Sequence, residues 1–132
     1  MWSQLKDMEF KHKFKASFDI KCANHGFGSD IEYKIGDTYV LIEYENSSRG
    51  MLSNLARVYR RFKIKQPKYL VLIYLRTDIH IQRFKNDKEN THNFADLIGQ
   101  SEGDKFCVKT FAAADYLEWS EYLKSLNKKA EK

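Results

Sequence analysis

The sequence predicts an α/β domain in which helices flank a mixed β-sheet. Three observations predict this class: alternating apolar and polar residues at 29–45, a continuous apolar run at 69–75, and helix-periodic segments between and after these strands. Alternation with a period of two indicates half-buried strands, whereas an unbroken apolar run indicates a strand buried on both faces. A chain of 132 residues is long enough to bury a core, and we expect a single domain over residues 1–132.

The first expected element is a helix from Trp2 to about Ser17, followed by a loop at 24–29. Two sets of residues recur at helical spacing on different sides of this helix, so the sequence does not decide which face is buried. The first set is Leu5, Met8 and His12, and the second is Phe10 and Phe14.

A β-hairpin is the clearest local pattern. Apolar and polar residues alternate on both sides of the glycine-containing pair at 36–37, which is typical of a two-residue hairpin turn. This turn pairs Ile31 with Ile42 and Asp30 with Glu43. The apolar partners then share one face, which supports the register because a slip of one residue would scatter them.

The remaining segments alternate between helix and strand. In chain order we expect a helix at 51–63, a strand at 69–75, a short helix at 94–98, a strand at 106–111 and a helix at 113–126. Residues 79–84 show no clear pattern. The expected order is therefore α, β, β, α, β, α, β, α.

Charge and cysteine content narrow the class of protein. The net charge of +5 favours a polyanionic partner, either nucleic acid or an anionic surface. Cys22 and Cys107 lack metal-type spacing and fit a reducing compartment better than a disulfide scaffold, although a single bridge stays open. The sequence has no signal-peptide pattern and no apolar run of membrane-spanning length. We expect a soluble cytoplasmic protein with no membrane role.

Three carboxylates converge on the polar face of the hairpin. Asp30 lies opposite Glu43, and Glu45 is its diagonal neighbour. Two carboxylates about 5 Å apart repel by about 3 kcal/mol at an effective dielectric constant of about 20. A divalent cation such as Mg²⁺ removes this penalty, because it takes carboxylate oxygens together with waters and phosphate. The alternative is a solvated hairpin face on which Glu32 is also exposed and Lys34 dilutes the repulsion.

The acids and their setting resemble the motif of the PD-(D/E)xK nuclease superfamily. Glu43 follows Asp30 by 13 residues, and Glu45 comes after one spacer, before a polar turn into a helix. The segment 39–46 resembles the central strand of the family, and 55–59 its following helix. Two departures are Ser29, where proline is frequent, and Glu45, where lysine is expected. A minority of restriction enzymes in the superfamily carry Glu-x-Glu.

The resemblance implies a restriction endonuclease-like core of αβββαβ type over about residues 5–76, completed by residues 77–132 with a lysine-rich tail. It implies a Mg²⁺-dependent DNA endonuclease of the restriction, homing, recombination or repair type, with Mn²⁺ as a substitute. Asp30 and Glu43 would bind the metal, and Glu45 would bind it or accept a proton from the attacking water. Glu9 is the best match for a further acid on the first helix, and Lys34 for the missing lysine. For both, an ordinary surface residue is the alternative.

A run of basic residues follows the acids and is the expected contact for the DNA backbone. Its members are Arg49, Arg57, Arg60, Arg61, Lys63, Lys65 and Lys68. The alternative is an ordinary solvated helix face. A short chain has little room for a sequence-reading domain, so on double-stranded or branched DNA we expect a homodimer, a higher homo-oligomer or a partner subunit. A catalytically inactive nucleic-acid-binding module and a small interaction domain remain the competing hypotheses.

Overall fold

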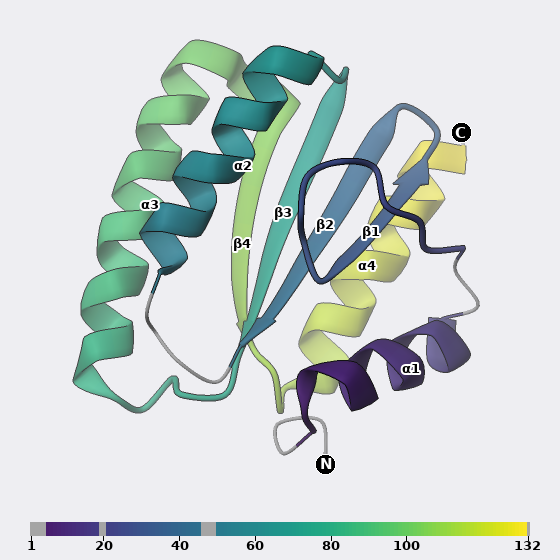
Figure 1. Cartoon of the computed structure of the whole chain (residues 1–132), viewed down its shortest axis with the longest axis vertical. Coiled ribbons are helices and arrows are strands. Elements are labelled where there is room, and N and C mark those ends of the chain that lie inside the picture. The colour runs from purple at the N-terminus through teal and green to yellow at the C-terminus, as the bar shows by residue number, and fades with distance from the viewer. Residues whose placement is uncertain (1–4, 19–20, 46–49, 132) are drawn as a thin grey trace.

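The structure, a computed structural model, describes residues 5–18, 21–45 and 50–131, except for the side chains of Asp7, Glu45 and residues 129–131 (Figure 1). The elements in chain order are α1 (Asp7–Phe18), β1 (Ile31–Ile35), β2 (Thr38–Glu45), α2 (Met51–Lys65), β3 (Tyr69–Arg76), α3 (Gln82–Glu102), the 3₁₀ helix η2 (Gly103–Lys105), β4 (Phe106–Ala112) and α4 (Tyr116–Glu131). The expected order of helices and strands is confirmed. Within the described residues two strands, not three, lie between α1 and α2.

The four strands form one mixed sheet in the order β1-β2-β3-β4. β1 runs antiparallel to β2, whereas β3 and β4 run parallel to β2. The hairpin register is confirmed, because Ile31 lies opposite Ile42 and Ile35 opposite Thr38. The turn uses Gly36 at a φ of 57°, a left-handed conformation that glycine adopts without steric cost.

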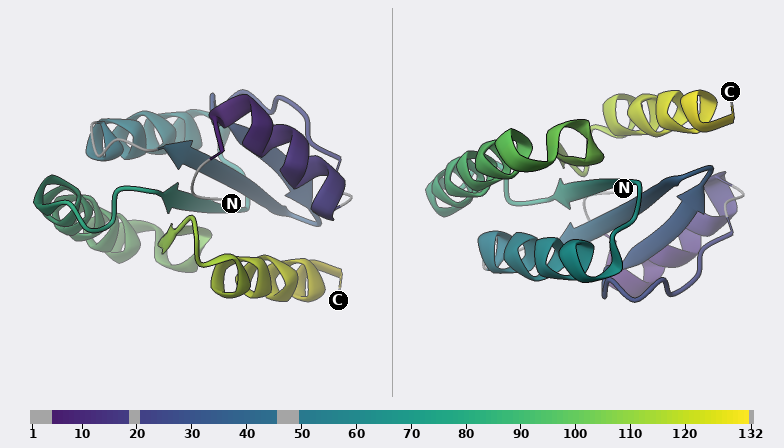
Figure 2. Two further views of the ribbon diagram at one scale, coloured as in Figure 1. Left: turned by 90° about the horizontal axis from the view of Figure 1, so that it is seen from below. Right: turned by 90° about the horizontal axis from the view of Figure 1, so that it is seen from above.

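Helices α1 and α4 cover one face of the sheet, and α2 and α3 cover the other (Figures 1 and 2). Phe10 and Phe14 bury the inner side of α1 against Trp119 of α4, which answers the open question about that helix. On the other face, apolar residues of α2 pack with Leu72 of β3 and Ile98 of α3. β3 is buried on both faces, as its apolar sequence predicts.

Helix α3 is the main correction to the sequence-based expectation. It spans Gln82–Glu102, whereas periodicity predicted only a short helix at 94–98. Its buried residues, Phe84, Thr91 and Ile98, form a single narrow stripe, and Phe84 is the one apolar residue between Gln82 and His92. Such a stripe gives little periodic signal.

The cysteines and the helices bear on two of the expectations from the sequence. Cys22 and Cys107 do not form a disulfide bond. Within the part of the chain that the structure describes, no helix combines the length and apolar character needed to cross a bilayer.

Candidate functional site

Asp30 and Glu43 lie side by side at the end of the hairpin away from its turn, next to the Ile31–Ile42 pair. The backbone N–H of Tyr44 donates to Asp30 Oδ2 at 2.9 Å, and the backbone N–H of Asp30 donates to Glu43 Oε1 at 3.2 Å. An amide of the opposing strand therefore orients each carboxylate. Asp30 is half-buried and Glu43 is only 4% exposed. A carboxylate kept out of water is stable as an anion only with hydrogen bonds or a cation. Each of these two carboxylates has a backbone hydrogen bond, and the pair could also hold a cation.

Glu32 is an organising residue that the sequence pattern did not identify. Its side chain is 5% exposed, so the interpretation of a solvated hairpin face is wrong for both Glu32 and Glu43. Its carboxylate accepts three backbone N–H groups, from His25 at 2.8 Å, Ser29 at 3.0 Å and Phe27 at 3.4 Å. Because charge-assisted hydrogen bonds are strong, Glu32 fixes the loop that leads directly into Asp30.

A cleft of about 550 Å³ opens beside Asp30. Its lining comes from α1, from the loop before β1 and from β1 itself: Lys11, Lys15, Cys22, Ala23, Asn24, Gly28, Ser29, Asp30, Ile31 and Glu32. Lys11 and Lys15 stand one helical turn apart, so their ammonium groups share a side of α1. With Asp30 and Glu32 on one wall and lysines on another, the cleft suits a metal-bound phosphodiester, although Glu43 is not among its lining residues. Neither lysine was predicted as a site residue, because their only signal in the sequence is the i,i+4 spacing.

Three cations of α2 lie against the loop at 26–28. The Arg57 Nη1 group donates to the Gly28 carbonyl at 3.3 Å, and a Cβ atom on Gly28 would collide with the guanidinium groups of Arg57 and Arg61. The Lys65 Nζ atom lies 5.8 Å from the centroid of the Phe27 ring. Gly28 also lines the cleft, so this loop lies between the basic side of α2 and the carboxylate site, and no α2 residue lines the cleft itself.

The other basic residues expected to contact DNA do not lie against the loop at 26–28 in the part of the chain that the structure describes. Lys63 bonds Glu102 at 3.0 Å, and Lys68 pairs with Asp37 at 3.5 Å. Both lysines line a separate depression at the C-terminal end of α2. Arg60 is exposed on α2, and Arg49 lies outside the described residues. The expected basic surface is therefore divided, and only its Arg57, Arg61 and Lys65 part meets the loop beside Asp30.

The other predicted catalytic residues are Glu45, Glu9 and Lys34. The backbone of Glu45 lies opposite Arg76 of β3, but its side chain is outside the described part. Glu9 is exposed on α1. Lys34 is also exposed, with its Nζ atom 5.2 Å from the centroid of the Tyr39 ring. Among the described side chains, no group of three or more His, Cys, Asp or Glu residues is arranged to hold a metal. The donors that the structure brings together are thus Asp30 and Glu43, two hard oxygen ligands of the kind that Mg²⁺ prefers.

Comparisons of the chain with protein-family models, with curated proteins and with solved structures found no match. The function therefore has to be inferred from the hairpin, its cleft and the basic residues around them.

Proposed function

We propose that this protein is a Mg²⁺-dependent DNA endonuclease that hydrolyses phosphodiester bonds. The proposal is carried by the pair Asp30 and Glu43, whose carboxylates are each oriented by an amide of the opposing strand. Mg²⁺ takes one or two protein carboxylates and fills its other positions with water and phosphate oxygens, which suits this donor set. Mn²⁺ has the same ligand preference and is expected to substitute.

The roles of the residues follow from their positions. Asp30 and Glu43 would hold the ion, and Glu45 of the same strand would add a third carboxylate or accept a proton. The ion would lower the pKa of a bound water and stabilise negative charge on the phosphate. Lys11 and Lys15 would bind backbone phosphates from the opposite wall of the cleft. Arg57 and Arg61 would hold the loop at Gly28 and add positive charge beside it.

A restriction endonuclease-like core belongs to the same proposal. The order α1-β1-β2-α2-β3 agrees with that core except for one strand, since the αβββαβ type has three strands before the second helix. Part of the loop before β1 runs along the β1 edge, where the Ala23 N–H donates to the Glu32 carbonyl at 3.1 Å. This segment supports the proposed restriction endonuclease-like core, because it occupies the position beside β1 where a further strand would pair.

The test is nicking of supercoiled plasmid with and without Mg²⁺ or Mn²⁺. Asp30→Asn and Glu43→Gln keep side-chain oxygen acceptors for the backbone amides but remove the negative charge that binds the ion. We expect nicking that depends on the divalent ion and falls by about 100-fold or more in each variant. Asp37→Asn is the matched control, because Asp37 is an exposed acid in the turn of the same hairpin and should nick like the wild type. Equal nicking by all four proteins would refute the metal site.

A catalytically inactive DNA-binding module is the second candidate, favoured by Glu45 at the position where the nuclease motif has lysine. It predicts salt-sensitive DNA binding without cleavage in either metal ion.

For the nuclease, cutting both strands of a duplex calls for a second active site, so we propose a homodimer or a partner subunit. Light scattering of the purified protein with and without DNA measures that state. The cytoplasmic location expected from the cysteines is part of the same proposal.

A further inference from the structure

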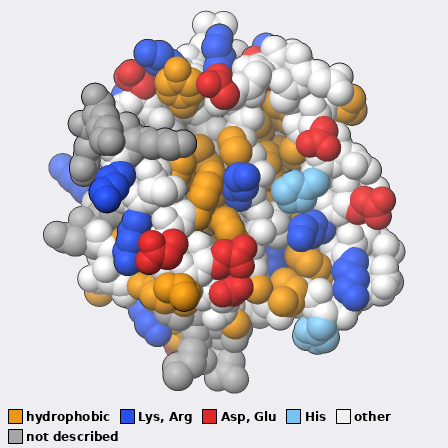
Figure 3. Space-filling view, turned by 180° about the vertical axis from the view of Figure 1, so that it is seen from behind, with side chains coloured by type: hydrophobic (Ala, Val, Ile, Leu, Met, Phe, Trp, Pro, Cys, Tyr) orange, Lys and Arg blue, Asp and Glu red, His pale blue; other side chains and the backbone are white. Residues whose placement is uncertain are grey.

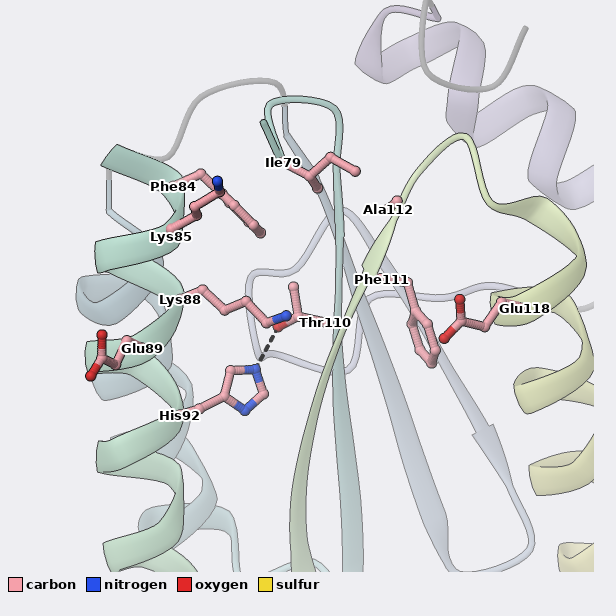
Figure 4. A pocket seen from close by; sticks show the side chains of 10 residues that line it. All are labelled: Ile79, Phe84, Lys85, Lys88, Glu89, His92, Thr110, Phe111, Ala112 and Glu118. Atoms are coloured by element: carbon pink, nitrogen blue, oxygen red, sulfur yellow. Dashed lines mark hydrogen bonds between the residues drawn. The ribbon is translucent and has the colours of Figure 1, made fainter. Parts of the chain in front are cut away.

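A second pocket lies at the opposite edge of the sheet from Asp30, and the proposed nuclease makes no use of it. It measures about 610 Å³ and is formed by the β3–α3 loop, α3, the last residues of β4 and the start of α4 (Figure 4). From behind, hydrophobic side chains are exposed along a strip in this region, with histidine and basic side chains (Lys or Arg) beside it (Figure 3). Pockets of this size with apolar walls and a few polar groups are typical of small-ligand sites.

The apolar walls face one another across the pocket. Ile79 and Phe84 form one end, and Phe111 of β4 lies on the other side (Figure 4). Ile79 is 42% exposed whereas Phe84 is 4% exposed, so Ile79 is the part of this wall that is open to solvent. Aromatic rings bind flat apolar groups well because they gain both area burial and favourable ring geometry.

The polar groups between these walls favour an anion. The Lys88 side chain reaches toward Thr110, and His92 Nε2 lies 2.7 Å from Thr110 Oγ1 (Figure 4). Lys85 lines the same pocket from the previous turn of α3. An ammonium group beside a hydroxyl and an imidazole offers several hydrogen-bond donors to a carboxylate or phosphate.

Two acids belong to the lining as well. Glu89 points away from the other side chains in Figure 4. Glu118 of α4 lies beside Phe111, across the pocket from α3 (Figure 4). Among the charged side chains of the lining, Lys88 is the one that reaches the centre of the pocket, beside Thr110 (Figure 4).

We propose that this pocket binds a small organic anion that carries a flat aromatic body next to its carboxylate or phosphate. The body lies against Ile79 and Phe111, and the anionic group lies at Lys88 and Thr110. The site is separate from the Asp30 cleft, because β4 and β1 are the two opposite edge strands of the sheet. Binding here goes beyond the proposed nuclease and does not require it.

The test separates the body of the ligand from its charge. Four probes are added to ¹⁵N-labelled protein: deoxyadenosine monophosphate, indole-3-acetate, the uncharged deoxyadenosine and inorganic phosphate. We expect the first, the second or both to shift the amide signals of His92, Thr110 and Phe111, and the last two to bind about tenfold more weakly. Deoxyadenosine monophosphate and indole-3-acetate show whether the pocket binds a phosphate or a carboxylate.

Variants locate the site. Lys88→Gln removes the central charge and should weaken binding of the best probe about tenfold, and Thr110→Val should weaken it severalfold. Lys124→Gln is the control, since Lys124 is an exposed lysine on α4 outside the pocket. The proposal is overturned if neither aromatic anion binds, if the shifts map to the Asp30 cleft, or if Lys88→Gln binds like the wild type. Amide spectra of each free variant confirm that the fold is intact.

Discussion

The two edges of the sheet are built in different ways. At the β1 edge, backbone amides hold the polar side chains: Glu32 accepts three from the loop, and amides of the opposing strands orient Asp30 and Glu43. At the β4 edge, a hydrogen bond between two side chains, His92 and Thr110, lies in an open pocket. Groups fixed by the backbone are better preorganised than groups that depend on rotamers. We therefore expect the β1 edge to be the rigid edge suited to chemistry, and the β4 edge to adapt to a ligand.

The largest effect on stability is expected at Glu32. Glu32→Gln leaves one oxygen acceptor and turns an NH₂ group toward backbone donors, so at least one buried amide loses its partner. The free energy of unfolding should fall by about 2–3 kcal/mol. Urea denaturation measures this change, and hydrogen exchange of the His25, Phe27 and Ser29 amides should become faster.

Asp37→Asn is the control for Glu32, because Asp37 is an exposed acid in the same hairpin. Its effect on the unfolding free energy should stay within about 0.5 kcal/mol. If both variants lose the same stability, Glu32 does not organise the loop, and the contrast between the two edges fails.

Local patterns were sufficient to predict the hairpin. Alternation on both sides of a glycine turn leaves one register in which Ile31 and Ile42 share the core face, and the structure has this register. That register also brought Asp30 and Glu43 together. Helix α3 was missed over most of its length because few of its residues are buried.

The role of Glu32 could not be predicted for a different reason. Alternation assigns a residue to a face of a strand, but it does not say whether a loop covers that face. The partners of Glu32 are backbone amides, which have no sequence signature. The same holds for Arg57 and Arg61: their helical position indicates a polar face, and only the tertiary structure brings the loop at Gly28 onto it.

A smaller effect is expected at Gly28, where the loop meets α2. Gly28 has a φ of 73°, which costs an alanine about 1–2 kcal/mol. The new Cβ atom would also collide with the guanidinium groups of Arg57 and Arg61, so both must move. Gly28→Ala should therefore destabilise the protein by more than the backbone strain alone, as measured by urea denaturation.

Gly50→Ala separates the two contributions. Gly50 has a similar φ of 77°, but a Cβ atom there would meet none of the described atoms within 4 Å. It should show the backbone strain without the collision, and it should leave DNA affinity unchanged, whereas Gly28→Ala should weaken DNA binding. Equal losses in the two variants would mean that the arginines do not pack on the loop.

The smallest effect concerns the β4 edge and depends on pH. Burial lowers the pKa of His92 most, Lys88 lowers it next, Asp96 raises it, and Lys109 adds the smallest lowering effect. An unfolded chain protonates its histidines near pH 6.5, so below that pH the unfolded state binds more protons than the folded state. The free energy of unfolding should be insensitive to His92 above about pH 7.5 and should decrease as the pH falls through about 6.5.

His92→Gln tests this assignment, because glutamine does not titrate and keeps a polar group beside Thr110. Its unfolding free energy should fall less steeply than that of the wild type between pH 7.5 and 5.5, while the exposed His80→Gln should follow the wild type. An NMR titration of the imidazole gives the folded-state pKa directly. If His92→Gln and the wild type have the same slope, His92 is as accessible to protons as an exposed histidine, and the pocket at the β4 edge does not desolvate it.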